Sequence, residues 1–98
     1  MQKGYREYTL KMKALADETR LKIFAMLAAG ELCACKILEE FNITQPTLSY
    51  HMKILCDSGL IRSRRDGVWM KYSINKDSLN LLIYLLKDIN SRIHGSSE

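Results

Sequence analysis

Two cysteines separated by a single alanine, Cys33 and Cys35, are the side chains of this sequence best suited to chemistry. A thiolate is a soft ligand that prefers soft or thiophilic ions. Where thiols stand at the start of a helix, the helix dipole and the free N–H groups lower the thiol pKa and favour the thiolate. The pair is therefore a candidate site for a metal or metalloid ion, and Cys56 is a candidate third ligand.

The sequence leaves two other interpretations of these cysteines open. One is a redox-sensing pair, and the other is inert packing, because free cysteines behave as small buried apolar residues. Three cysteines in a chain expected in the cytoplasm do not favour a disulfide framework.

The cysteines are expected to lie on a helix that runs from Cys33 to Phe41, with Ile37 and Leu38 also apolar. Residues two apart on a helix point to different sides. Both sulfurs would therefore reach one ion only if the first turn unwinds. Such a turn would be a switch, because ligand binding would favour its distorted state.

The next stretch of the chain predicts a helix with two different surfaces. Thr44 is suited to cap it, and Pro46 falls in its first turn, where a missing N–H costs nothing. Leu48, Met52 and Leu55 recur at i, i+4 and i+7 and form an apolar stripe. The opposite surface carries polar side chains suited to base edges and phosphates in a DNA major groove: Gln45, Thr47, Ser49, Tyr50 and Lys53. An amphipathic helix with a solvated polar face is the alternative.

These two helices, joined by Asn42-Ile43, have the helix-turn-helix pattern. We also assign His51 to the DNA-contacting set, through hydrogen bonds within or beside the helix and not as a metal ligand. The helix is expected to end at Asp57-Ser58-Gly59.

A basic β-hairpin is predicted after this helix. Its strands would be Leu60–Arg65 and Val68–Ile74, joined by Asp66-Gly67, a strong short hairpin signal. Four cations decorate it: Arg62, Arg64, Arg65 and Lys71. Next to a helix-turn-helix, such a hairpin is a wing that contacts the DNA backbone or minor groove. The alternative is a charged edge that protects the sheet.

Three further helices complete the prediction. The first has an apolar side and ends near Ala16; the second is capped by Asp17 and stopped by Gly30, with its buried face at Leu21, Ile23, Phe24 and Leu27 or Ala28. The last begins at Asn75 or Asp77 and runs to about Ile93. Its apolar face is wider than one core needs, which predicts a homodimer through the first and last helices, at Tyr5, Tyr8, Met12, Leu79, Leu82, Ile83, Leu86, Ile89 and Ile93.

Size and composition fit one small domain over residues 1–98. The expected fold class is mainly α with a small β-hairpin, in the order of two helices, a brief strand near Glu31-Leu32, two helices, two strands and a last helix. The formal charge of +4 favours a polyanionic partner such as double-stranded DNA. No apolar run reaches the roughly 18 residues of a membrane span, and no signal core follows Met1, so we expect a cytoplasmic protein.

The chain resembles the arsenical-resistance repressor (ArsR/SmtB) family over almost its whole length. Four motifs carry this likeness, in the family's order: Leu15-Ala16-Asp17-Glu18-Thr19-Arg20-Leu21-Lys22-Ile23, Glu31-Leu32-Cys33-Ala34-Cys35, Gln45-Pro46-Thr47-Leu48-Ser49-Tyr50-His51-Met52-Lys53 and Ser58-Gly59-Leu60-Ile61. It looks most like the arsenite-responsive members of Gram-positive arsenic-resistance operons. The resemblance implies a dimeric winged helix-turn-helix repressor without a permanently bound cofactor, released from operator DNA when As(III) or Sb(III) binds the cysteines.

The chain departs from the family pattern at several positions. Leu38 stands where many members have a third cysteine, so the resemblance implies a two-thiolate site, and Lys36 replaces a common Asp. Asp77 with His94 does not reproduce the last-helix metal site of other members. A thiol enzyme is disfavoured, since neither a phosphate-binding glycine loop nor a base paired with a nucleophile is visible.

Overall fold

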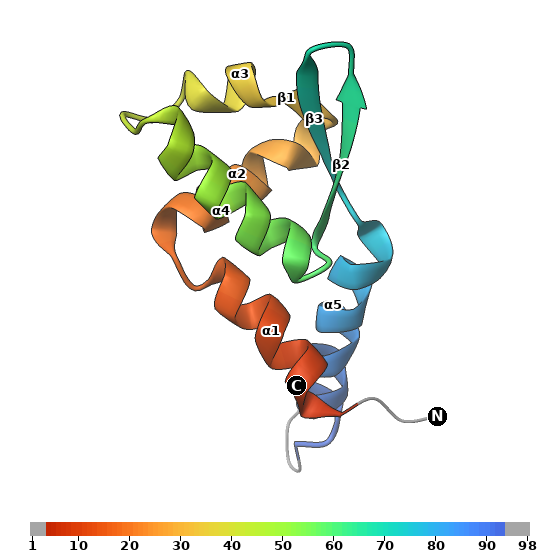
Figure 1. Ribbon diagram of the computed structural model, residues 1–98. Helices are drawn as coiled ribbons and strands as arrows, with labels where there is room; N and C mark the ends of the chain where they lie inside the picture. Colours follow the sequence, from red (N-terminus) through yellow and green to blue (C-terminus); the bar gives the residue numbers. More distant parts are fainter. Residues whose placement is uncertain (1–3, 94–98) are drawn as a thin grey trace.

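The computed structural model describes residues 4–93, which form helices and one small sheet in the predicted order (Figure 1). His94, which with Asp77 does not reproduce the last-helix metal site of other family members, lies outside the described residues. The elements are α1 (Tyr5–Leu15), α2 (Glu18–Met26), the 3-10 turn η1 (Leu27–Ala29), β1 (Leu32–Cys33), α3 (Ala34–Leu38), α4 (Gln45–Asp57), β2 (Ile61–Asp66), β3 (Trp69–Ile74) and α5 (Lys76–Ser91).

Side-chain caps begin three of the helices where the sequence predicted them. The Asp17 carboxylate accepts a hydrogen bond from the Arg20 N–H at 3.0 Å, and the Thr44 hydroxyl accepts one from Thr47 N–H at 3.3 Å. The Asn75 side chain caps α5 in the same way. Each cap satisfies one of the N–H groups that a first turn leaves without a partner.

The sheet is antiparallel in the order β1-β3-β2, so the predicted hairpin gains a third, two-residue strand. The turn differs from the prediction by one residue. Asp66 pairs with Trp69, which leaves Gly67 and Val68 as the two-residue loop. Gly67 takes a φ of +66°, and a glycine with positive φ at the first loop position is what a type II′ hairpin turn requires. The predicted Asp66-Gly67 loop is therefore wrong.

The core lies where α2, α3 and α4 meet the base of the hairpin. Its largest fully buried side chains are Ile23, Ile37, Met52, Leu55 and Leu60. Leu48, Met52 and Leu55 supply the predicted apolar stripe of α4. Leu21 was expected in this core, but its side chain is 52% exposed because α2 turns Ile23, Phe24 and the following Leu27 inward instead.

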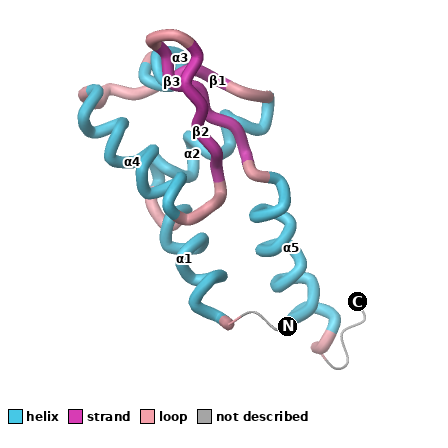
Figure 2. Tube along the Cα trace, turned by 45° about the vertical axis from the view of Figure 1, so that its right-hand side comes forward, coloured by secondary structure: helices cyan, strands magenta, loops and turns pink. Residues whose placement is uncertain are grey.

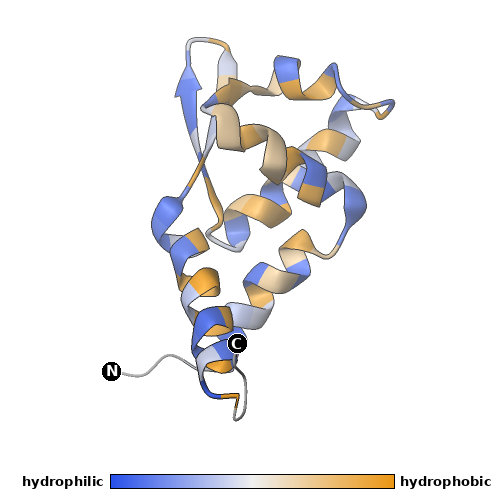
Figure 3. Ribbon diagram, turned by 180° about the vertical axis from the view of Figure 1, so that it is seen from behind, coloured by the Kyte–Doolittle hydropathy of each residue, from blue (hydrophilic) through white to orange (hydrophobic). Residues whose placement is uncertain are grey.

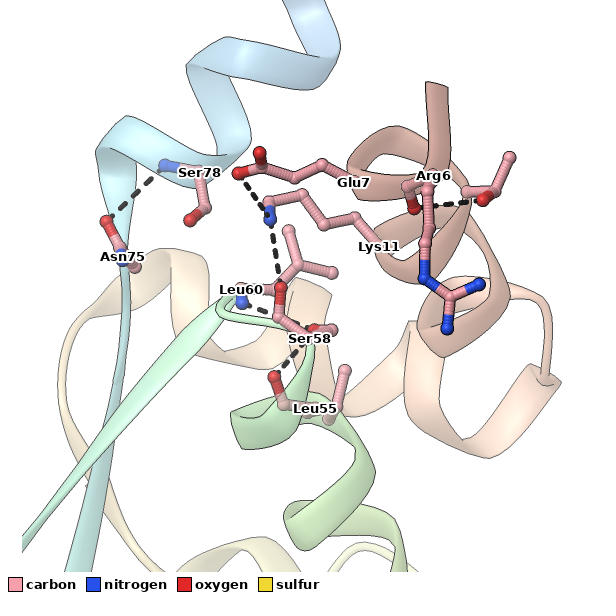
Figure 4. A network of polar contacts seen from close by, with 9 residues as sticks. Arg6, Glu7, Lys11, Leu55, Ser58, Leu60, Asn75 and Ser78 are labelled. Atoms are coloured by element: carbon pink, nitrogen blue, oxygen red, sulfur yellow. Dashed lines mark hydrogen bonds and ion pairs between the residues drawn. The ribbon is translucent and has the colours of Figure 1, made fainter. Parts of the chain in front are cut away.

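A buried polar network joins α1 to the end of α4 (Figure 4). The Lys11 ammonium donates to the backbone carbonyl of Ser58 at 3.0 Å and lies 3.6 Å from the Glu7 carboxylate. The Ser58 hydroxyl donates to the carbonyl of Leu55 and accepts from the N–H of Leu60. These partners make it tolerable to bury a lysine that is only 4% exposed, and they fix the direction in which α1 leaves the core.

The two helices predicted to form a dimer interface, α1 and α5, extend together away from the sheet (Figures 1 and 2). Hydrophobic residues recur along both helices (Figure 3). The large apolar side chains left exposed there are Tyr5, Leu10, Met12, Ile83, Tyr84, Leu86, Ile89 and Ile93. Three predicted interface residues behave differently: Leu82 is buried in the chain's own core, and Tyr8 and Leu79 pack against it. These three have less surface to offer a partner than their spacing suggested.

Candidate thiol site and nucleic-acid interface

The two cysteines meet at the junction between β1 and α3. Cys33 is the last residue of β1 and the N-cap of α3, with extended backbone at φ −79° and ψ 156°; Cys35 lies in the first helical turn. Their Cα atoms are 5.4 Å apart and their sulfurs form a disulfide. The predicted helix start at Cys33 is wrong: Cys33 stands outside the helix with an extended backbone, so the two sulfurs meet although the helical turn that begins at Ala34 stays intact.

The sheet holds this junction in place. In β1, Leu32 pairs with Tyr72 and Cys33 pairs with Lys71 of β3. The helix on the other side is shorter than predicted: α3 ends at Leu38 and not at Phe41. After Leu38 the backbone hydrogen bonds span three residues, as in a 3-10 helix: Glu40 N–H donates to the Ile37 carbonyl, and Phe41 N–H donates to the Leu38 carbonyl. Hydrogen bonds of this type tighten the last turn of a helix.

Cys56 is held apart from this pair. It packs against the core near the end of α4, and burial raises the pKa of its thiol, while a hydrogen bond with the Ser63 side chain acts in the opposite direction. A raised pKa disfavours the thiolate that a soft ion requires. Within residues 4–93, no group of three or more His, Cys, Asp or Glu side chains could hold a metal ion. The chain thus brings together two cysteines and no third ligand from the described residues.

The polar surface of α4 faces solvent, as its periodicity predicted. The side chains of Gln45, Thr47, Ser49, Tyr50 and Lys53 are all exposed. Two of them have local partners: the Thr44 hydroxyl donates to the Thr47 hydroxyl at 3.0 Å, and Lys53 pairs with Asp57 at 3.0 Å. The others are available to an incoming ligand.

His51 lies at the edge of this surface and is half-buried. Its Nδ1 lies 3.1 Å from a guanidinium nitrogen of Arg20, whose Nε donates to the carbonyl of Ala14 at 2.8 Å. The expectation that His51 hydrogen-bonds beside the helix is confirmed. Sequence reasoning missed the role of Arg20, which ties α1, α2 and α4 together; its signal was a basic residue where a capping box would have Glu or Gln.

Of the four cations on the hairpin, two form ion pairs with carboxylates and two do not. Arg64 makes a bidentate pair with Glu31, with both N–O distances at 2.7 Å, and Lys71 pairs with Asp66 at 3.0 Å. Arg64 and Lys71 stand opposite each other across the strands, so the carboxylates offset a like-charge repulsion. Arg62 and Arg65 are exposed and have no carboxylate partner among residues 4–93.

Glu31 was not recognised from the sequence as part of this surface. Its hydrogen bonds with Arg64 hold the pKa of the carboxyl below its ordinary value and raise that of the guanidinium. Because Glu31 immediately precedes β1, it links the chain segment that carries Cys33 to strand β2 of the hairpin.

Known proteins are similar to this chain in both sequence and fold. Residues 17–63 match the family model described as bacterial regulatory protein, arsR family. The arsenical resistance operon repressor of Staphylococcus aureus is 45% identical over 88 residues, which span 90% of this chain and 85% of the relative. This chain belongs to the ArsR family. Membership confirms the resemblance drawn from the four sequence motifs.

Solved ArsR structures share the winged helix-turn-helix fold. A crystal structure of an ArsR family transcriptional regulator superposes with a TM-score of 0.88 over 99% of this chain and 100% of the other, at 23% identity. A homodimeric winged helix-turn-helix DNA-binding domain from Mycobacterium bovis, a possible ArsR-family regulator, gives 0.71 over 99% and 97%, at 27% identity. The predicted fold class is confirmed. Among residues 4–93, no helix has both the length and the apolar character that crossing a membrane demands.

Proposed function

We propose that this ArsR-family regulator is a cytoplasmic repressor that binds operator DNA as a homodimer and is released when As(III) or Sb(III) binds Cys33 and Cys35. The observation that carries the proposal is the meeting of these two sulfurs at the β1–α3 junction. Both ions are thiophilic, and thiolates are the protein ligands they prefer. The 45% identical relative from S. aureus is named an arsenical resistance operon repressor.

DNA binding is assigned to α4 and the hairpin. With α4 in the major groove, its exposed Thr47, Ser49 and Tyr50 would read base edges, while Gln45 and Lys53 would contact bases or phosphates. The hairpin cations would contact the backbone of the adjoining minor groove. A twofold dimer of such a domain fits an imperfect palindrome with half-sites about one turn, or 34–36 Å, apart.

The homodimer is assigned to the exposed apolar faces of α1 and α5. Met12, Ile83, Leu86 and Ile89 are each between 38% and 59% exposed, and several large exposed apolar side chains on two neighbouring helices are typical of an interaction site. The M. bovis domain of the same fold is described as homodimeric. A monomer mass by light scattering at micromolar concentration would contradict this assignment.

Two connections would carry the signal from the thiol pair to the DNA surface. One runs through α3, whose buried Ile37 belongs to the same core as Leu48 and Met52 of α4. The other runs through β1, which pairs with β3 of the hairpin, and through the ion pair between Glu31 and Arg64. Two thiolates that close on one ion at the junction would therefore favour a different arrangement of α4 and the hairpin.

A second candidate function is a thiol-redox repressor, and the disulfide between Cys33 and Cys35 favours it. Oxidation and metalloid binding would use the same two sulfurs and the same junction. A thiol enzyme is not proposed, because within residues 4–93 the only side-chain interaction of Cys33 and Cys35 is the disulfide between them, with no hydrogen bond from either sulfur to a base.

An operator-release titration tests both candidates. The reduced protein on labelled operator DNA is titrated with As(III), Sb(III), Cd(II), Zn(II) and peroxide, and the same series is run on Cys33→Ser, Cys35→Ser and Cys56→Ser. We expect As(III) and Sb(III) to release the wild type and the Cys56→Ser control, whereas the other two variants stay bound. Release by peroxide alone would contradict the metalloid function and support the redox one.

A further inference from the structure

A groove of about 300 Å³ is lined by Cys35, one member of the thiol pair. Its lining residues include Cys35 and Leu38 of α3, Leu48 of α4, and Met70 and Tyr72 of β3. Most of its lining is apolar, and its volume lies at the lower end of the range for small-molecule sites. A ligand attached to Cys35 therefore has an apolar space within reach.

The coordination chemistry leaves one position on arsenic to be filled from outside the protein. Trivalent arsenic forms three bonds, and the described residues provide two cysteines with no group of three candidate ligands. In arsenite the third position would hold a hydroxyl group or a small thiol. In an organic arsenical, R–As(OH)₂, the third position already holds a carbon substituent, so two thiols complete the coordination.

We propose that the thiol pair and the groove together form a site for trivalent arsenic carrying one apolar organic substituent, with an aryl group such as phenyl in the groove. This inference rests on the proposed metalloid function and names its preferred ligand class. Each cysteine thiol of the reduced pair replaces one hydroxyl group on R–As(OH)₂. Two S–As bonds form, two As–O bonds break, two water molecules leave with the thiol protons, and arsenic stays trivalent.

The expected preference of the site for a phenyl over a methyl arsenical follows from the apolar surface that the substituent buries. Each methylene-sized group taken out of water is worth roughly a factor of four in affinity. A phenyl arsenical should therefore bind about tenfold or more tightly than a methyl arsenical in this groove.

The same groove touches the proposed DNA surface. Gln45 and Ser49 of α4 line its rim together with Val68 at the hairpin tip. A substituent seated there would lie between the start of α4 and the hairpin, the two regions assigned to DNA. Aryl arsenicals should accordingly release the operator at lower concentration than arsenite does.

The test measures the phenyl-to-methyl affinity ratio of the reduced protein without DNA. Trp69, the single tryptophan of the chain, lines the groove and reports binding by fluorescence. Titrants are phenylarsonous acid, methylarsonous acid and arsenite, in a phosphine reductant that holds the cysteines as thiols. The variants are Met70→Ala at the groove, Val68→Ala at its exposed rim and Met26→Ala as a matched control on α2.

We expect a ratio of about ten or more in the wild type and in Met26→Ala, and a ratio at least about threefold lower in Met70→Ala. Val68→Ala, at an 81% exposed position that the fold tolerates, should lower the ratio in the same direction. An unchanged ratio in both groove variants would overturn the inference and leave the arsenite function intact. Failure of all three arsenicals to bind, with operator release by peroxide alone, would overturn the proposed function itself.

Discussion

Helix α4 and the hairpin are both assigned to the same proposed partner, DNA, but they hold their polar side chains differently. On α4, Gln45 and Ser49 are exposed and make no side-chain hydrogen bond within residues 4–93. On the hairpin, Arg64 and Lys71 are engaged by Glu31 and Asp66. The helix can therefore contact bases without losing an internal bond, whereas these two cations must exchange a carboxylate for a phosphate.

This difference between α4 and the hairpin separates the choice of DNA sequence from the overall affinity for DNA. Base edges distinguish sequences, and phosphates do not. If α4 reads bases while the hairpin contributes a salt-dependent phosphate term, substitutions in the two regions will have different signatures.

The largest effect is expected on the helix. Tyr50→Ala should weaken operator binding by roughly 1–3 kcal/mol, the value of a base contact, and leave binding to random-sequence DNA unchanged. Tyr50 is 61% exposed, so the free energy of unfolding should change by less than about 0.5 kcal/mol. Fluorescence anisotropy on both DNAs measures the effect. An equal loss on operator and random DNA would mean that Tyr50 reads no base.

On the hairpin, Arg65→Ala should weaken all DNA binding by about 1 kcal/mol at physiological salt and reduce the slope of log K against log salt by about 0.9, the value of one phosphate contact. Arg64→Ala should flatten the slope less, because Glu31 already neutralises part of that charge. Titrations over a range of salt concentrations compare the two. Identical slopes for both variants would show that Glu31 does not restrain Arg64.

The start of α4 depends on its cap, and this affects stability. Thr44→Ala removes the acceptor for the Thr47 N–H and should lower the free energy of unfolding by about 1 kcal/mol. Thr9→Ala is the matched control, since the Thr9 hydroxyl only donates to a carbonyl within α1 on an exposed surface. Urea denaturation measures both. Equal destabilisation by the two variants would argue that the cap contributes nothing specific.

The smallest effect is expected from removing the ion pair between Glu31 and Arg64 of the hairpin. Glu31→Gln should free Arg64 and raise DNA affinity only about twofold, because solvent screens an ion pair on an exposed surface and keeps its contribution small. Arg64 lowers the pKa of Glu31 from its ordinary 4.5, so the pair is fully formed above that pH and is lost as the pH falls through the lowered value. The gain should therefore be constant between about pH 6 and 8. A gain in DNA affinity that varies with pH within this window would mean that a titrating group other than Glu31 causes it.

The difference between contacts that are local along the chain and contacts between distant segments explains which parts of the structure the sequence predicts. The caps Asp17, Thr44 and Asn75 bond to N–H groups three residues ahead, and the stripe of α4 repeats every three or four residues. Such features depend on neighbours along the chain, so residue type and spacing reveal them. The helix-turn-helix and the hairpin followed from signals of this range, and the proposal of a site at Cys33 and Cys35 rests on the same kind of signal.

Only the tertiary structure decided the contacts between distant segments. Glu31 meets Arg64 across 33 positions, and Arg20 meets His51 across 31; neither pair has a local signature, because many charged residues could have been partners. The pairing of β1 with β3 gave Cys33 an extended backbone where periodicity predicted a helix. Packing also turned Leu82 into the core and Leu21 out of it. Sequence periodicity identifies an apolar face, but which of its residues become buried depends on the angle at which the next element crosses it.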